Sequence, residues 1–157
     1  MKKTFAFAAS AVLVALAGCA GGGAPEVDDS PAGQAYVYRQ AVMDLVANKM
    51  GTVGGMARGE IPDDQAAFTK AAADLVTLAG MVTEGFEVEG VPAGSRSTPD
   101  IWSNMGDFEA KAQDFTNAVS AVAAAAQSGD FAGAKELAGN IGGTCGGCHR
   151  PYRAAAE

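Results

Sequence analysis

Two cysteines and one histidine lie close together near the end of this 157-residue chain, in the run Cys145-Gly-Gly-Cys148-His149. His149 is the only histidine in the sequence, and the third cysteine, Cys19, is far away along the chain. Cys-X-X-Cys-His is the pattern at which c-type haem is attached. Two thiols three residues apart on a helix lie on one face and can bond both vinyl groups at one edge of a porphyrin. The imidazole that follows can bind the iron as an axial ligand. The sequence therefore predicts one covalent haem on Cys145 and Cys148, with His149 as the proximal iron ligand.

Other interpretations of this motif lack some of the parts they need. A structural zinc site normally has four protein ligands, and only two cysteines and one histidine are at hand. A thioredoxin-like redox pair lies at the start of a helix after a strand, whereas these cysteines come late in a predicted helix. A disulfide between two positions of one regular helix is sterically awkward. A chance match in a bundle that merely scaffolds a partner is the remaining alternative.

Four long segments follow Ser30, separated by glycine, proline and capping residues. They run from Ser30-Pro31 to about Gly59, from after Pro62 to about Gly85, from Thr98-Pro99-Asp100 to Ser128-Gly129, and from Asp130 onwards. Thr98 is the expected capping residue of the third segment, with Pro99 at the first helical position. No run alternates like a strand. The predicted fold is therefore all-α, an antiparallel four-helix bundle over residues 31–157.

Each segment carries an apolar stripe whose residues recur every three or four positions. The stripes are Tyr36, Met43, Val46, Met50 and Val53; Phe68, Ala71, Leu75, Leu78 and Val82; Ile101, Met105, Phe108, Ala112, Phe115, Val119 and Val122; and Phe131, Ala134, Ala138, Ile141, Cys145, Cys148 and Tyr152. The two cysteines belong to the last stripe, so both sulfurs are expected to point into the bundle, with the haem between helices. Glycines 139, 142, 143, 146 and 147 weaken this helix, and we expect them to make room for the macrocycle.

The first 18 residues have the pattern of a secretory signal peptide, because Lys2-Lys3 precede a short apolar run from Phe5 to Leu16. The run Leu16-Ala17-Gly18-Cys19 resembles a lipobox, so we expect Cys19 to be the lipidated first residue of the mature protein. Residues 19–30 would then form a flexible tether. Ordinary cleavage nearby, without lipidation, is the alternative. The predicted location is the periplasm, anchored by lipid to a bacterial membrane.

The predicted mature chain is strongly acidic. Lys2 and Lys3 are lost with the signal, so 9 basic residues remain of the 11 in the sequence, against 18 acidic ones, and the formal charge becomes −9. Such a surface repels nucleic acid and anionic lipid headgroups. Nucleic acid is therefore not an expected partner, and the charge favours a redox partner protein with a basic patch.

Taken together, these residues resemble the class II c-type cytochromes, the cytochrome c′ family, over nearly the whole predicted mature chain. The resemblance rests on Arg39 four residues before Met43, on the run Pro99-Asp100-Ile101-Trp102, and on the segment from Cys145 to Arg153. It implies that Arg39 pairs with a haem propionate and that Tyr152 and Arg153 pack near His149. The lipobox is a departure from the usual soluble members of the family, and a lipid anchor there would limit free diffusion between partners.

Met43 matches the distal-face position, which differs among members of the family, and Val46 lies beside it. If the Met43 thioether binds iron, the haem is six-coordinate and low-spin, as in electron carriers. If Met43 only packs as a core residue, the haem is five-coordinate and open to nitric oxide or carbon monoxide. Met50 and Met56 are weaker candidates for the distal ligand.

The sequence thus predicts a haem-binding electron-transfer protein of the periplasm, with a gas-binding cytochrome as the alternative. We expect no enzymatic activity, because no motif places a second titratable group beside the iron. The resemblance also implies that two chains can pair through their first two helices.

Overall fold

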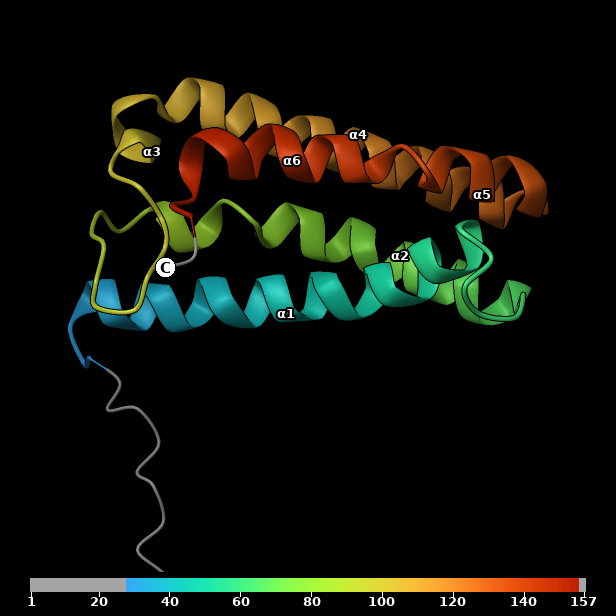
Figure 1. Cartoon of the computed structure of the whole chain (residues 1–157), viewed down its shortest axis with the longest axis horizontal. Coiled ribbons are helices and arrows are strands. Elements are labelled where there is room, and N and C mark those ends of the chain that lie inside the picture. The colour runs from blue at the N-terminus through green and yellow to red at the C-terminus, as the bar shows by residue number, and fades with distance from the viewer. Residues whose placement is uncertain (1–27, 156–157) are drawn as a thin grey trace, which may run out of the picture.

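The computed structural model describes residues 28–155, which form an elongated bundle of helices (Figure 1). The elements are α1 (Pro31–Ala57), α2 (Gln65–Met81), the 3₁₀ turn η1 (Glu84–Phe86), α3 (Asp100–Ser103), α4 (Met105–Gln127), α5 (Phe131–Ala138) and α6 (Ile141–Tyr152). The predicted signal peptide, Cys19 and most of the tether lie outside the described residues.

The arrangement is the predicted antiparallel four-helix bundle, with α5 and α6 following one another as its fourth member (Figure 1). The helix α2 packs against both α1 and α4, and α4 packs against α5 and α6. Within residues 28–155, extended pairing is confined to one isolated bridge between Ser97 and Arg153. The stretch 65–86 is long and apolar enough to cross a membrane by length and composition alone, but its buried side is typical of a core helix.

Side-chain caps explain where three of the helices begin. Ser30 accepts a hydrogen bond from the backbone N–H of Gly33, three residues on, and Pro31 occupies the first helical position. Asp64 caps α2 and Asp130 caps α5 in the same way. At the other end of α4, Gly129 has a φ of +86°, a conformation that favours glycine and ends the helix.

The core confirms most of the predicted stripes. Phe68, Leu75, Val53 and Val119 are fully buried, and the rings of Phe68 and Phe131 meet edge to face with centroids 5.2 Å apart. All five members of the second stripe are buried. The first stripe is wrong at its start, because Val42 faces the core instead of Tyr36. The Tyr36 hydroxyl donates to the carbonyl of Gly94, in the loop beyond α2.

The predicted third helix is interrupted at Asn104, which separates α3 from α4 with φ −132° and ψ 40°. The predicted cap at Thr98 is also wrong. Pro99 occupies the cap position, and the Thr98 hydroxyl is buried without a hydrogen-bond partner among the described residues. Thr98 does take part in a different contact, since its backbone N–H donates to the carbonyl of Tyr152 at 3.1 Å. This residue therefore joins the loop to the end of α6.

The predicted fourth helix is likewise interrupted, at Gly139 and Asn140. The apolar stripe continues in register across the interruption, because Ala138 and Ile141 are both buried. A second apolar cluster lies at the α6 end of the bundle. It consists of Phe86, Ile101, Phe108 and Tyr152, with Trp102, Met105 and Cys148 packed against it. This cluster holds the last turn of α6 against η1, α3 and α4.

Candidate cofactor site

The helix α6 places Cys145, Cys148 and His149 half-buried at the wall of the bundle. Cys145 packs against the main core and Cys148 against the second cluster, so both thiols lie on the inward side of the helix as predicted. Neither forms a disulfide within the described residues. Burial raises the pKa of both thiols. This is the opposite of the lowered pKa that activates a thioredoxin-like pair.

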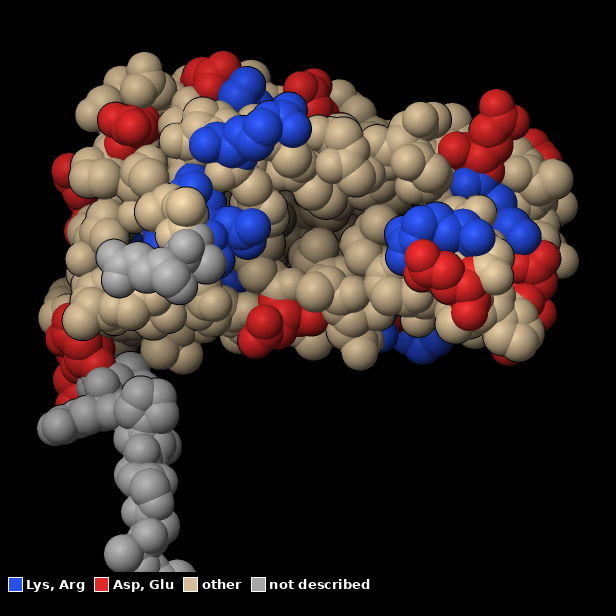
Figure 2. Space-filling view, in the orientation of Figure 1, with Lys and Arg blue, Asp and Glu red and all other residues tan. Residues whose placement is uncertain are grey.

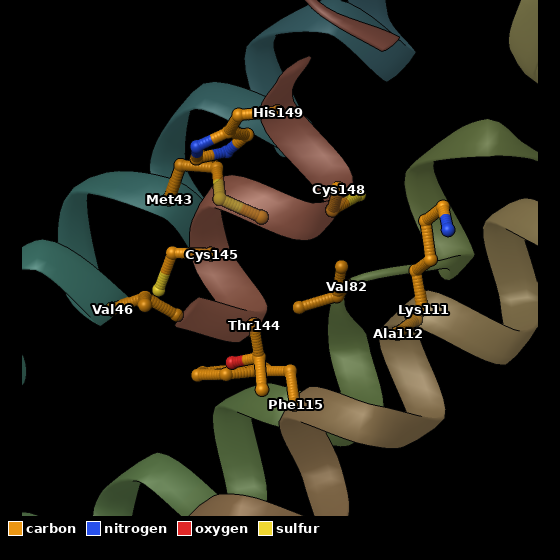
Figure 3. Close-up of a pocket in the computed structure, with 10 residues that line it drawn as sticks. All are labelled: Met43, Val46, Val82, Lys111, Ala112, Phe115, Thr144, Cys145, Cys148 and His149. Atoms are coloured by element: carbon orange, nitrogen blue, oxygen red, sulfur yellow. The ribbon is translucent and has the colours of Figure 1, made fainter. Parts of the chain in front are cut away.

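Two cavities open beside these thiols. The smaller, of about 60 Å³, is almost wholly apolar and is drawn in Figure 3. All four members of the bundle contribute to its walls. The lining residues are Met43, Val46, Val82, Lys111, Ala112, Phe115, Thr144, Cys145, Cys148 and His149. The larger cavity, of about 420 Å³, shares Met43, Val46, Val82 and the three motif residues with the smaller one. The thiols, the imidazole, Met43 and Val46 therefore line both cavities.

Met43 and Val46 of α1 line both cavities, together with His149 of α6 (Figure 3). Met43 is partly buried and packs against the main core. Met50 lines only the larger cavity. Met56 lies in the core, 3% exposed, and lines neither. Among the three predicted distal candidates, Met43 thus has the position that best suits an iron ligand.

Arg39 is buried beside the larger cavity, with 5% of its surface exposed. Its Nη1 donates to the carbonyl of Gly85 at 2.9 Å, and its guanidinium lies 4.9 Å from the centre of the Phe86 ring. Its Nε and Nη2 atoms have no hydrogen-bond partner within residues 28–155. Burial lowers the pKa of Arg39. A buried cation with two free donors facing a cavity is suited to an anionic group of a ligand.

Arg153 and Arg96 line the same cavity from the segment that follows α6 and from the loop before α3. The Arg96 guanidinium donates to the carbonyl of Ala154 at 3.0 and 2.6 Å, and Ser97 pairs with Arg153 in the isolated bridge. Arg96, Arg153 and Arg39 are therefore three arginines that line the same cavity. Arg153 lies close to His149, because its backbone N–H donates to the His149 carbonyl at 3.1 Å.

The environment of His149 favours a neutral imidazole. Burial is the main cause of its lowered pKa, with the positive charges of Arg153 and Arg96 adding to it. A neutral imidazole is the form that binds metal ions. Tyr152, three residues on, is buried and donates a hydrogen bond to Asp107 at 2.5 Å, which raises its pKa to about 12. Tyr152 therefore fixes the end of α6 to α4.

The structure also shows site residues that the sequence did not single out. Arg96, Lys111 and Phe115 line the cavities, but Arg96 lies in an irregular loop and the other two belong to ordinary helix patterns. The expectation that the α6 glycines make room for the macrocycle stays a prediction. None of glycines 139, 142, 143, 146 and 147 lines either cavity, and Gly142 and Gly143 are exposed.

Comparison with known proteins agrees with this geometry. The family model described as "Cytochrome C'" matches residues 34–153. A cytochrome c′ of Rubrivivax gelatinosus is 36% identical over 123 residues, which cover 77% of this chain and 95% of that protein. The structure of a cytochrome c prime from Shewanella frigidimarina superposes with a TM-score of 0.74 at 33% identity, covering 82% of this chain and 99% of that one. A nitric oxide complex of a cytochrome c prime variant from Alcaligenes xylosoxidans superposes with a TM-score of 0.72 at 29% identity, with coverage of 82% and 99%.

Proposed function

The chain belongs to the cytochrome c′ family, whose members carry one covalent haem c, and we propose that it transfers electrons in the bacterial periplasm. In this proposal Cys145 and Cys148 bind the haem, His149 is the proximal iron ligand and Met43 the distal one. The observation that carries it is that Met43 and His149 line the same two cavities as both cysteines. Electron transfer is favoured when both axial positions are filled, because little then rearranges on reduction.

The residues of the site fit a haem. Two thiols lie on one side of a helix next to a cavity of about 420 Å³, and the apolar side chains of Val46 and Val82 line it. The two free donors of the buried Arg39 offer a partner for a propionate carboxylate. When bound, the haem supplies an iron that changes between the ferric and ferrous states without transforming a substrate.

The chain's own residues then have separate tasks. The thiols attach the cofactor, and the neutral imidazole of His149 offers its lone pair to iron. Arg39, Arg96 and Arg153, which line the larger cavity, would supply positive charge to the carboxylates of the bound cofactor. The second apolar cluster, through Tyr152 and its bond to Asp107, keeps α6 in place.

The optical spectrum of the purified protein tests the axial ligands. We expect low-spin bands and a methionine-to-iron charge-transfer band in the ferric state. Met43→Leu should abolish that band and give a high-spin spectrum, while Met50→Leu, the matched control at the edge of the same cavity, should leave it unchanged. A high-spin spectrum in the unaltered protein would contradict ligation by Met43.

Gas binding is the second candidate function, and one observation favours it. The cavity of about 60 Å³ beside Met43 is almost purely apolar, which suits a small neutral ligand. The solved structure of a similar cytochrome c prime variant from Alcaligenes xylosoxidans is a nitric oxide complex. In this case Met43 only packs, and carbon monoxide added to the ferrous protein should shift its spectrum at once. No shift on adding carbon monoxide would refute the open site.

Covalent attachment is tested separately from ligation. Acidified acetone should not extract the haem from the unaltered protein. Replacing both cysteines, as Cys145→Ala with Cys148→Ala, should give a haem-free variant with no attached mass. Haem lost to acetone from the unaltered protein would refute attachment through these thiols.

Export, anchoring and pairing remain proposals that rest on the sequence. We expect mass spectrometry to find a mature N-terminus at Cys19 that carries acyl chains, with the protein held at a membrane on the periplasmic side. An unmodified N-terminus downstream of Cys19 would remove the anchor. Pairing of two chains through α1 and α2 is checked by sedimentation equilibrium.

A further inference from the structure

The two cavities have a basic border. Arg39, Arg96 and Arg153 line the larger one and Lys111 the smaller one. Among the residues that the structure describes, Asp44 is the only acidic one that lines either cavity. In Figure 2 the blue side chains of Lys and Arg gather beside the hollow on this face, near α6 and the segment that follows it.

Arg150 extends this border, because it is exposed on α6 directly after His149. Asp107 belongs to the border too, since it pairs with Lys111 at 3.3 Å. Among residues 28–155, the lining of the two cavities thus holds four Lys or Arg residues against one carboxylate. We call the five basic residues, Arg39, Arg96, Lys111, Arg150 and Arg153, the basic rim.

We propose that the basic rim is the docking surface for the redox partner, and that this partner presents an acidic surface. The proposal rests on the proposed electron-transfer function and names the partner's chemistry. A partner must approach the cofactor cavity, and the charge it meets there is opposite in sign to that of the whole chain. The net charge alone predicted a basic partner. The basic rim instead predicts an acidic surface on any partner that docks over the cavities.

Local charge outweighs net charge at ordinary ionic strength. The screening length is about 10 Å at 0.1 M salt. With 23 residues, α4 is about 34 Å long, so Asp130, which lies just beyond its C-terminal end, is screened from Lys111 of the rim. Two propionates would add two negative charges at the site. Arg96, Arg150 and Arg153 are nevertheless exposed to a partner.

Oxidation of the ferrous haem protein by two small reagents tests the sign of this surface. Ferricyanide carries three negative charges and tris(1,10-phenanthroline)cobalt(III) three positive ones, and each accepts one electron from the haem iron. Rates are measured by stopped flow between 0.05 and 0.3 M salt. We expect the ferricyanide rate to fall as salt is added and the cobalt rate to rise.

Substitutions in the rim give the size of the effect. A unit charge about 10 Å from a triply charged ion, screened at 0.1 M salt, changes the encounter rate about twofold. Arg150→Gln should thus slow ferricyanide oxidation about twofold, and Arg150→Glu about fourfold. Arg58→Glu is the matched control, because Arg58 lies about 28 Å along α1 from Arg39 and should change neither rate. The optical spectrum must be the same in all variants.

The possible outcomes distinguish the docking-surface proposal from the electron-transfer proposal on which it rests. A ferricyanide rate that rises with salt, or equal effects of Arg150→Glu and Arg58→Glu, would show that net charge dominates and would overturn the docking surface alone. A protein that neither reagent oxidises lacks a redox-active haem, and both proposals then fail.

Discussion

Gly147 and Gly129 allow the same substitution, glycine to alanine, to be made in two backbone conformations. Gly147 lies inside α6, between the two cysteines, and a Cβ added there would meet no atom within 4 Å. Gly129 has the same open space, but its φ is +86°. Because neither alanine would clash, the difference between the two variants reports the backbone conformation alone.

The magnitudes follow from these conformations. Glycine in a helix interior is about 1 kcal/mol less favourable than alanine, so Gly147→Ala should raise the free energy of unfolding by about 1 kcal/mol. Alanine in the left-handed region costs about 1–2 kcal/mol, partly offset by about 0.5 kcal/mol from the less flexible unfolded chain. Gly129→Ala should therefore lower the free energy of unfolding by about 1 kcal/mol. In a domain of this size, the melting temperatures of the two variants should differ by about 6–8 °C.

The assay is thermal and urea unfolding of both haem-loaded variants, followed by circular dichroism at 222 nm. Their optical spectra should equal that of the unaltered protein, which shows that the haem is bound normally. A Gly147→Ala variant that melts below the unaltered protein would refute the reasoning. In that case the space beside Gly147 is filled in the haem protein.

Three further predictions concern side chains. Tyr152→Phe removes the hydrogen bond to Asp107 that raises the pKa of Tyr152 to about 12. This bond stabilises the fold fully below pH 10, and its contribution is lost as the pH rises through 12. The urea midpoints of the variant and the unaltered protein should therefore differ at pH 7 and approach each other above pH 10. Arg39→Met should stabilise the haem-free variant against urea, because it removes a buried charge with two unpaired donors, and should destabilise the haem protein, where that charge has a propionate partner. Leu75→Ala should lower the free energy of unfolding by about 2–5 kcal/mol, since Leu75 is fully buried, yet leave the optical spectrum unchanged because Leu75 lines neither cavity.

Apolar spacing predicts the helices of this bundle well because each helix faces one core. Phe68, Leu75 and Val82 of the second stripe are all buried, as the spacing indicates. The same signal cannot reveal the interruptions at Asn104 and at Gly139 and Asn140. The apolar residues continue in register across both breaks, so the hydrophobic pattern does not differ from that of an unbroken helix.

The residues of the motif and Arg39 could be placed from the sequence, because their spacing or their resemblance to a family is local information. The rest of the cavity wall could not. Arg96 reaches the site through a bond to Ala154, 58 residues away along the chain. Thr98 has the sequence of a helix cap, yet its backbone pairs with Tyr152 instead. Contacts between distant segments leave no periodic trace in either segment.

The interruption between α5 and α6 divides the last member of the bundle into two units that can unfold separately. The helix α6 has 12 residues, four of them glycine, whereas α5 is fixed by its packing on α4 and by the ion pair of Lys135 with Asp63. Local opening of α6 should therefore cost less than opening the rest of the molecule. Both thiols would become accessible to the enzymes that attach haem while α1, α2, α4 and α5 stay folded, so cofactor insertion need not precede folding.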